Sequence, residues 1–146
     1  MLAGAGREDI DPAEALADGS AMDAWRAMIS AQGGDPAAPL PTARESHVVT
    51  ASTTGVLTRL DAMAVGLAAW RLGAGRARKE DAVQAGAGVV WHARPGDQVR
   101  AGDPLFTLLT DEPERFGRAL ESLDGGYDID DGSVFTPAPL VIDRIG

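Results

Sequence analysis

Residues 88–110 read GVVWHARPGDQVRAGDPLFTLLT, and this stretch decides the fold of the chain. Its first apolar run, Val89 to Trp91, stops before Pro95-Gly96-Asp97, where proline presets φ and glycine accepts a positive φ. A second turn sequence of the same kind follows at Ala101-Gly102-Asp103-Pro104, with Val99 as the one apolar residue between the two turns. Because an apolar run, LFTLL, then resumes, we predict a compact β corner built from two successive tight turns.

The aspartates of the two turns, Asp97 and Asp103, allow two interpretations. Together they could form a carboxylate pair for metal binding or acid/base chemistry. Alternatively, each caps its own turn by accepting backbone N–H groups, which is far commoner for turn aspartates, and we favour this interpretation. Similar corners, with V-x-x-G-D-x-L after a P-G-D turn, occur as scaffold in small sandwich-like barrels of the biotinyl and lipoyl type.

Length and composition limit the classes of protein to consider. The chain has 146 residues, enough for one domain with a real core plus an appendage. Its formal net charge of −9, with the acidic residues scattered, argues against binding of nucleic acid or of an anionic membrane. It contains no cysteine, which excludes disulfides and thiolate zinc sites. We recognise no signal peptide or membrane span and expect a cytoplasmic protein.

Residues 1–34 are predicted to form a helical segment. The run Asp11-Pro12-Ala13-Glu14 combines an N-cap, a proline at the first helical position and a capping-box glutamate, and this short helix should stop near Asp18-Gly19. A second helix begins at Ser20 and ends before Gly33-Gly34. On one of its faces lie Met22, Trp25, Met28 and Ile29. Such a stripe could bind a ligand, but packing in a core or between domains is commoner, and we predict packing.

Three prolines within residues 35–44 predict an extended connection. We therefore place the domain boundary there, with residues 45–146 as the main domain. In this domain we expect strands at 47–51 and 55–60, then a helix from Ala62 to about Leu72 with Asp61 as its cap, Gly73 at its end, and Met63, Leu67 and Trp70 on one face.

Beyond the corner, residues 111–114 predict the start of a last helix that carries Phe116 and Leu120. Late strands are expected at 127–129 and 139–145. Strands outnumber helices in the main domain, and they do not alternate with helices as they would in a doubly wound sheet. The fold class is therefore predicted to be α+β.

Few residues carry the signature of a chemical site. The glycines of Gly73-Ala74-Gly75-Arg76 could cradle a phosphate, but they follow a helix instead of opening one, so a helix stop is favoured. His47 and His92 have no partner at the spacing of a triad or a metal site, and we expect structural roles for both. Lys79 is the only lysine and thus the only candidate for a covalently attached cofactor. Its charged neighbours do not match the hairpin tip that carries lipoyl or biotinyl groups.

Two stretches of the chain match the sequence pattern of one known family. Residues 13–35, AEALADGSAMDAWRAMISAQGGD, are similar to the pattern L-x-S-G-x-A-x-x-x-F-x-x-M-x-x-A-Q-G-G-D, with Trp25 in place of phenylalanine and Asp18 in place of a small residue. The matching residues are Leu16, Gly19, Ala21, Met28, Ala31, Gln32, Gly33, Gly34 and Asp35. Further matches follow in the same order at Gly55, 72–76, 79–81, Gly88, Gly96-Asp97, Val99, Gly102-Asp103 and Leu105. Together these residues resemble the thymidine and pyrimidine nucleoside phosphorylases.

This resemblance implies an α/β hammerhead with a barrel-sandwich hybrid, preceded by a short helical segment from the end of the phosphorylase core. It also implies a homodimeric parent enzyme, a pentosyltransferase that converts thymidine and phosphate to thymine and 2-deoxyribose 1-phosphate. The family's phosphate loop and its base-binding arginine, serine and lysine lie upstream of the residues matched here. We therefore assign no catalytic, cofactor-binding or metal-binding residue in this chain.

The implied role is structural support of the phosphate-binding lobe, with the remainder of the phosphorylase as partner and no catalysis by this chain alone. Two alternatives of other classes stay open. A stand-alone carrier module would need Lys79 to be acylated, whereas a protein-interaction module would use the helix that carries Trp25.

Overall fold

A computed structural model describes residues 5–132, 134–137, 139, 141–143 and 145. The chain divides into two compact units, Met1–Leu40 and Pro41–Gly146. Each unit is described separately below.

The first unit contains two helices whose ends follow from local capping. Helix α1, Pro12–Ala17, begins where the Asp11 carboxylate accepts a hydrogen bond of 2.9 Å from the Ala13 N–H. Helix α2, Ser20–Ala31, begins after Gly19, which has a left-handed conformation, and its end is followed by Gly33 with φ of 81°. The two predicted helices are therefore confirmed.

The apolar face of α2 is not a core of this unit. Met22, Trp25 and Met28 are 49%, 44% and 49% exposed, and neither helix contains a buried residue. The prediction of core packing is thus wrong for residues 1–40, because two short helices bring too few side chains together to enclose a face. Packing between domains stays a prediction.

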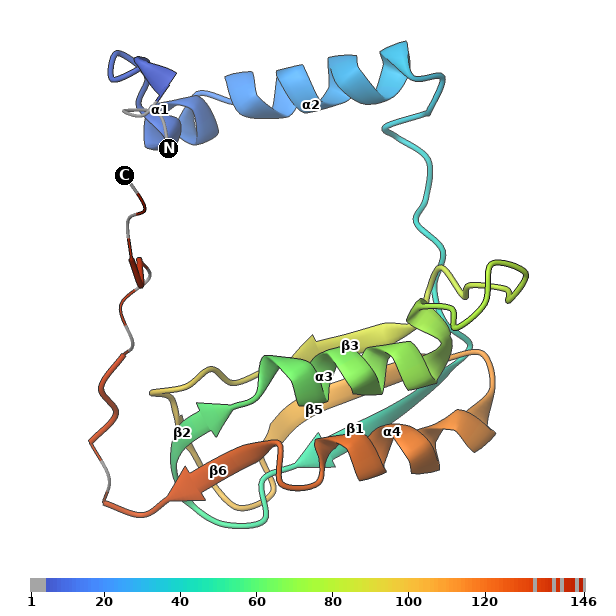
Figure 1. The fold of residues 1–146 in the computed structure, drawn as a ribbon, viewed down its shortest axis with the longest axis vertical. Helices are drawn as coiled ribbons and strands as arrows, with labels where there is room; N and C mark the ends of the chain where they lie inside the picture. Colours follow the sequence, from blue (N-terminus) through green and yellow to red (C-terminus); the bar gives the residue numbers. More distant parts are fainter. Residues whose placement is uncertain (1–4, 133, 138, 140, 144, 146) are drawn as a thin grey trace. The chain divides into compact units, whose positions relative to one another are not determined.

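The second unit contains two antiparallel sheets, shown in Figure 1. One sheet has the order β1-β5-β3 and the other the order β4-β2-β6. The strands are β1 (Glu45–Thr50), β2 (Gly55–Leu60), β3 (Gly88–Trp91), β4 (Gln98–Val99), β5 (Pro104–Thr110) and β6 (Tyr127–Asp130). The helices are α3 (Ala62–Ala69), which continues as a π-turn η2 (Trp70–Ala74), and α4 (Phe116–Leu123), which follows a 3-10 turn η3 (Pro113–Arg115).

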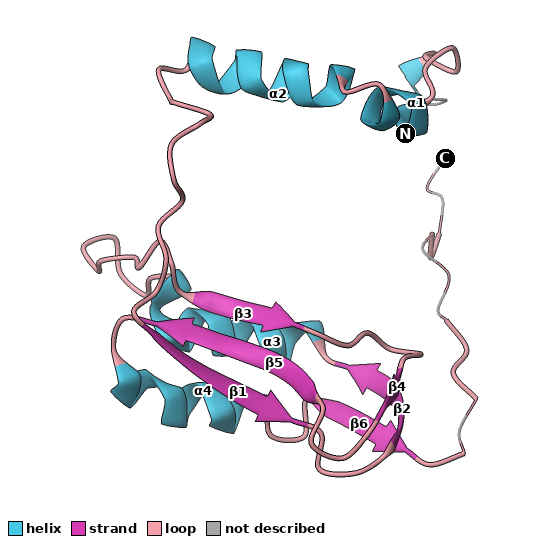
Figure 2. Ribbon diagram, turned by 180° about the vertical axis from the view of Figure 1, so that it is seen from behind, coloured by secondary structure: helices cyan, strands magenta, loops and turns pink. Residues whose placement is uncertain are grey.

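This content confirms the α+β class. Among the described residues the two sheets do not join into one closed barrel, and the hammerhead and barrel-sandwich details stay predictions. Helices α3 and α4 both lie on one face of the β1-β5-β3 sheet, and Figure 2 shows the opposite face without a helix of this unit. On the covered face Phe106 and Leu108 are fully buried in the core.

The core side of α3 differs from the face that the sequence pattern indicates. Met63 is 70% exposed, and Leu67 and Trp70 are also exposed, whereas Ala68 and Leu72 are fully buried. Ala68 and Leu72 are four residues apart and share the side of the helix opposite Met63, Leu67 and Trp70, so those three side chains face outward. The Asp61 cap is as predicted, with its carboxylate accepting from the N–H groups of Met63 and Ala64.

The predicted corner is a pair of equivalent turns. In each turn an aspartate accepts a hydrogen bond of 2.8 Å from the backbone N–H three residues before it, so Asp97 bonds Arg94 and Asp103 bonds Arg100. The glycine before each aspartate has a positive φ, 101° for Gly96 and 92° for Gly102, which residues with side chains rarely adopt. The capping interpretation of both aspartates is therefore confirmed.

Each turn also exchanges two backbone hydrogen bonds with one residue of a distant segment. The Leu57 N–H donates to Asp97 O at 3.0 Å, and Gly96 N–H donates to Leu57 O at 2.8 Å. Ala51 makes the corresponding pair with Asp103 and Gly102, both at 2.8 Å. The double turn thus bonds to the residue that follows β1 and to the interior of β2.

The late strand predicted at 139–145 is wrong for its described residues, none of which lies in a strand, while residues 140 and 144 fall outside the described part. Val141, Ile142 and Ile145 are 73%, 94% and 96% exposed. No described strand pairs with them, and an apolar alternation forms a strand only where an edge accepts its backbone groups. The earlier of the two late strands is confirmed as β6.

We expect the aspartates of the double turn to stabilise the whole second unit. Asp97→Ala and Asp103→Ala should each lower the free energy of unfolding by about 1 kcal/mol, because each leaves a turn N–H without its acceptor. Urea unfolding of the full chain measures the effect. The control is Asp124→Ala, since no described residue bonds that carboxylate and it lies at the C-terminal end of α4. Equal losses in all three variants would contradict this assignment.

An ion pair connects the β2 and β6 strands. Arg59 Nε lies 2.6 Å from Asp128 Oδ2, and Arg59 Nη2 donates to Gly125 O at 2.6 Å. The hydrogen bond from Arg59 lowers the pKa of the Asp128 carboxyl, and the bond to Asp128 raises the pKa of Arg59. The carboxylate form of Asp128 is therefore favoured in the folded state.

The lowered pKa of Asp128 makes the stability of the fold depend on pH. The lowered pKa of Asp128 gives stability that is present above the unfolded-state value of about 3.9 and is lost as pH falls through the lower folded value. Wild type and Asp128→Asn should therefore differ in Tm at neutral pH and converge in strong acid. Thermal unfolding followed by circular dichroism checks this expectation, and a Tm difference that stays constant with pH would count against it.

Candidate functional site

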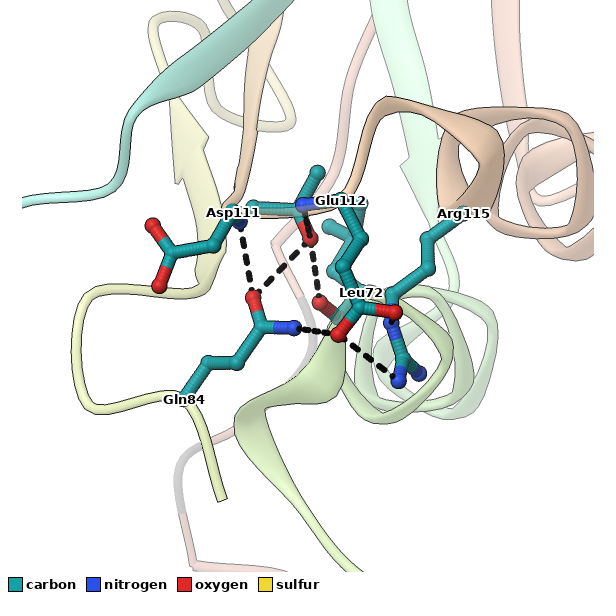
Figure 3. Close-up of polar contacts among 6 residues, drawn as sticks. Leu72, Gln84, Asp111, Glu112 and Arg115 are labelled. Atoms are coloured by element: carbon teal, nitrogen blue, oxygen red, sulfur yellow. Dashed lines mark hydrogen bonds and ion pairs between the residues drawn. The ribbon is translucent and has the colours of Figure 1, made fainter. Parts of the chain in front are cut away.

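A polar network centred on Gln84 lies at the end of β5 (Figure 3). The Gln84 side-chain oxygen accepts hydrogen bonds from the Asp111 N–H at 2.8 Å and the Thr110 hydroxyl at 3.0 Å. Its side-chain nitrogen donates to Glu112 Oε1 at 2.6 Å. Because Asp111 N–H can only donate and a carboxylate can only accept, these neighbours determine the orientation of the Gln84 amide.

Thr110 connects the network to the helix end. Its side chain is fully buried, and its hydroxyl donates to Leu72 O at 2.7 Å. A hydroxyl has one hydrogen, so the Thr110 O–H is shared between two acceptors, Leu72 O at the shorter distance and the Gln84 side-chain oxygen at the longer one. The Gln84 backbone N–H also donates to Gly73 O at 2.9 Å. The network therefore holds the residues that follow α3 against the end of β5.

Glu112 and Arg115 form the outer part of the network. Arg115 Nη2 donates to Glu112 Oε1 at 3.1 Å, and Arg115 Nε lies 3.0 Å from Oε2. The Nε contact is an ion pair without the direction of a hydrogen bond, so the buried Nε remains without a hydrogen-bond acceptor. Glu112 thus neutralises Arg115, and Gln84 supports the carboxylate from the other side.

Next to this network is an open cavity of about 610 Å³. Three segments line it: the π-turn η2, the loop of residues 75–84, and the turn and helix η3–α4. Four arginines lie on its wall, together with three carboxylates and the indole of one tryptophan. These are Arg71, Arg76, Arg115, Arg118, Asp81, Glu112, Glu114 and Trp70. The cavity therefore presents mixed charge with an aromatic wall.

The structure brings only one of the sequence candidates to this cavity. The Gly73–Arg76 segment lines it through Gly75 and Arg76, although Gly73, with φ of 108°, stops a helix as predicted. His92 Nε2 lies 2.8 Å from the Thr107 hydroxyl, and the His47 ring centroid lies 5.6 Å from that of Phe116. Both histidines thus pack against neighbouring strand or helix residues.

Lys79 lies in the exposed loop between η2 and β3, and its carbonyl accepts a hydrogen bond of 3.2 Å from Arg76 Nη1. It is not at the tip of a hairpin between two strands. The carboxylates of Asp97 and Asp103 are engaged in their own turns. Trp25 belongs to the first unit.

Sequence reasoning missed Gln84, Thr110 and Arg115 altogether, and it saw Glu112 only as part of a helix start. A single glutamine in a loop has no local pattern that marks it. The one available signal was the acidic run at 111–114 next to a buried strand, because carboxylates near a core need partners.

The part of the chain that the structure describes contains neither a metal-binding cluster nor a helix suited to cross a membrane. No group of three or more histidine, aspartate or glutamate side chains is arranged to hold a metal ion there. Among the described helices, none is long and apolar enough to span a bilayer.

Comparison with known proteins gives the family. The model of the pyrimidine nucleoside phosphorylase C-terminal domain matches residues 56–130. Thymidine phosphorylase from Mycobacterium tuberculosis (strain H37Rv) is 54% identical over 145 residues, which cover 99% of this chain and 34% of that protein. The chain belongs to the pyrimidine nucleoside phosphorylase family.

Other members of the pyrimidine nucleoside phosphorylase family are similar over most of the chain. Pyrimidine-nucleoside phosphorylase from Staphylococcus haemolyticus is 35% identical over 80% of this chain and 28% of its own length. The enzyme of the same name from Geobacillus stearothermophilus is 35% identical over 69% of this chain and 24% of its own length. The chain thus spans about a third or less of the length of these curated relatives and corresponds to their C-terminal portion. The matched range, 56–130, includes the whole Gln84 network.

Gln84→Glu should destabilise the chain by about 1–3 kcal/mol at neutral pH, because it replaces an N–H donor with a second carboxylate beside Glu112. The loss should shrink in acid, where one carboxyl becomes protonated and can donate again. Urea unfolding at several pH values measures both effects. Gln84→Met removes the same bonds without adding charge, so its cost should not vary with pH. Parallel pH profiles for the two variants would refute the charge argument.

Proposed function

We propose that this chain is the C-terminal domain of a thymidine phosphorylase, whose whole enzyme converts thymidine and phosphate to thymine and 2-deoxyribose 1-phosphate. The observation that carries the proposal is the 54% identity with the mycobacterial thymidine phosphorylase over 99% of the chain. The relatives named pyrimidine-nucleoside phosphorylase are less similar, at 35% identity, which favours thymidine as the substrate of the parent enzyme.

The proposed role of the domain is structural support of the phosphate-binding lobe, without catalysis by this chain alone. Phosphorolysis requires cationic groups and N–H donors that converge on phosphate and on the leaving base. The chain has a formal net charge of −9 and one lysine, and we match none of its residues to the family's phosphate loop. The support would come from the double turn and the Gln84 network, which make the second unit a firm scaffold.

The finer architecture is part of the proposal. Residues 1–34 would be the end of the phosphorylase core, residues 35–44 a connection, and residues 45–146 a hammerhead and barrel-sandwich domain. The two sheets and the two helices that cover one of them are compatible with this arrangement. The partner would be the remainder of the phosphorylase, in a cytoplasmic homodimer that binds neither nucleic acid nor membrane.

The carrier and interaction alternatives are not favoured. The family comparisons point to a phosphorylase domain, and Lys79 lies in a loop that follows a helix end, flanked by Arg78 and Glu80. Trp25 is 44% exposed, and its proposed partner is the remainder of the parent enzyme.

The test is complementation. The chain is mixed with the separately expressed N-terminal two thirds of the mycobacterial relative, and thymine release from thymidine and phosphate is measured. We expect no release by either piece alone and release by the mixture, with Asp103→Ala giving less activity in proportion to its lost stability. Thymine release by this chain alone would refute the proposed role, as would a complex that forms but remains inactive.

A further inference from the structure

The lining of the cavity beside the Gln84 network contains more arginines than carboxylates. Four of the chain's twelve arginines line it. Arg115 is neutralised by Glu112, and Arg71 has a longer contact of 3.5 Å with Glu121 Oε2. The two remaining arginines, Arg76 and Arg118, therefore determine what the cavity attracts.

Neither of these two arginines has a charged partner within the described part of the chain. Arg76 Nη1 donates only to the uncharged carbonyl of Lys79, at 3.2 Å. The Arg118 guanidinium has no hydrogen bond or ion pair among the described residues, although its backbone carbonyl accepts from Arg71 Nη1 at 2.7 Å. Free guanidinium groups bind phosphate and carboxylate oxygens through parallel N–H donors.

The carboxylates of the cavity oppose these arginines only in part. Asp81 Oδ2 accepts the backbone N–H groups of Ala77 and Arg78, at 3.2 and 2.9 Å, and so shapes the loop. Glu112 is paired with Arg115. Asp81 and Glu114 have no cationic partner among the described residues. The wall as a whole carries four guanidinium groups and three carboxylates, and this excess of one positive charge favours an anionic ligand.

Trp70 adds a flat apolar wall. Its ring lies so close to Gly75 that a Cβ at that position would meet the indole Cδ1 at 2.8 Å, so the glycine allows the ring to rest against the backbone. A ring held in this way is preorganised for stacking with a planar group. The volume of about 610 Å³ is in the range of small-molecule sites.

We propose that this cavity binds a phosphate monoester with a planar ring, such as a nucleoside monophosphate. Arg76 and Arg118 bind the phosphate oxygens, and the ring of the ligand packs on Trp70. Glu114 weakens binding through its charge.

The probe is uridine 5′-monophosphate, titrated into the full chain by isothermal titration calorimetry, with uridine and inorganic phosphate titrated separately. We expect saturable binding of the ester, tighter than that of either half. Arg76→Ala and Arg118→Ala should each weaken it about fivefold or more, since a charge-assisted hydrogen bond is lost. Glu114→Gln should strengthen it, and added salt should weaken it.

The matched control is Arg100→Ala, which removes the same charge from a turn that does not line the cavity. It should leave the affinity unchanged. Arg118→Lys keeps the charge and separates the role of the planar guanidinium from that of charge alone. In a Trp25→Phe/Trp91→Phe background, the remaining indole N–H resonance reports on Trp70 by NMR and should shift with the same affinity.

Three outcomes would overturn the proposal: no saturable binding of the ester, equal weakening by Arg100→Ala and Arg118→Ala, or inorganic phosphate binding as tightly as the ester. Urea unfolding of each variant shows whether it is folded. A loss of binding by a folded variant is then due to the change in the cavity. The result does not depend on thymine release, and the two proposals can therefore fail separately.

Discussion

The fold depends on the reciprocal hydrogen bonds that join the double turn to the residue after β1 and to strand β2. Each turn closes itself with an aspartate and then exchanges two backbone bonds with one residue, Leu57 for the first turn and Ala51 for the second. These bonds satisfy backbone groups that a tight corner would otherwise leave without partners. They also place Val99 and Leu105, each two residues after an aspartate, in the core. Both sheets receive a strand from this corner.

The Gln84 network performs a similar task at the far end of β5, with side chains in place of turns. Thr110 and Gln84 satisfy carbonyl and N–H groups where the helix end, the loop and the strand meet. Such a network stabilises most when its members have partners, because an unpaired buried polar group costs about 1–3 kcal/mol. The buried Arg115 Nε has no hydrogen-bond acceptor among the described residues, but the Glu112 carboxylate neutralises its charge. The loop that carries Arg76 is therefore anchored at Gln84 on a rigid base.

The Gln84 network and the cavity beside it lie in the same domain. The chain corresponds to the C-terminal portion of relatives about three times its length, and its acidic composition provides few groups for phosphate chemistry. Four of its twelve arginines nevertheless line one cavity, on segments that the network and α4 hold in place. Rigid elements orient guanidinium groups at low entropic cost, which is what recognition of an anion requires.

The sequence by itself determined the caps of α1 and α3, the two turns of the corner and the α+β class, whereas the cap predicted at 111–114 makes no side-chain capping hydrogen bond. Its matching residues indicated the family. Asp61, Asp97 and Asp103 bond groups within three residues, so their roles can be predicted from local chemistry. Only the tertiary structure decided that Ala68 and Leu72 face the core, since periodicity marks a face without showing what packs on it. It also assembled the Gln84 network and the arginine cavity, whose side-chain hydrogen bonds between segments join residues 26 to 47 positions apart that share no local pattern.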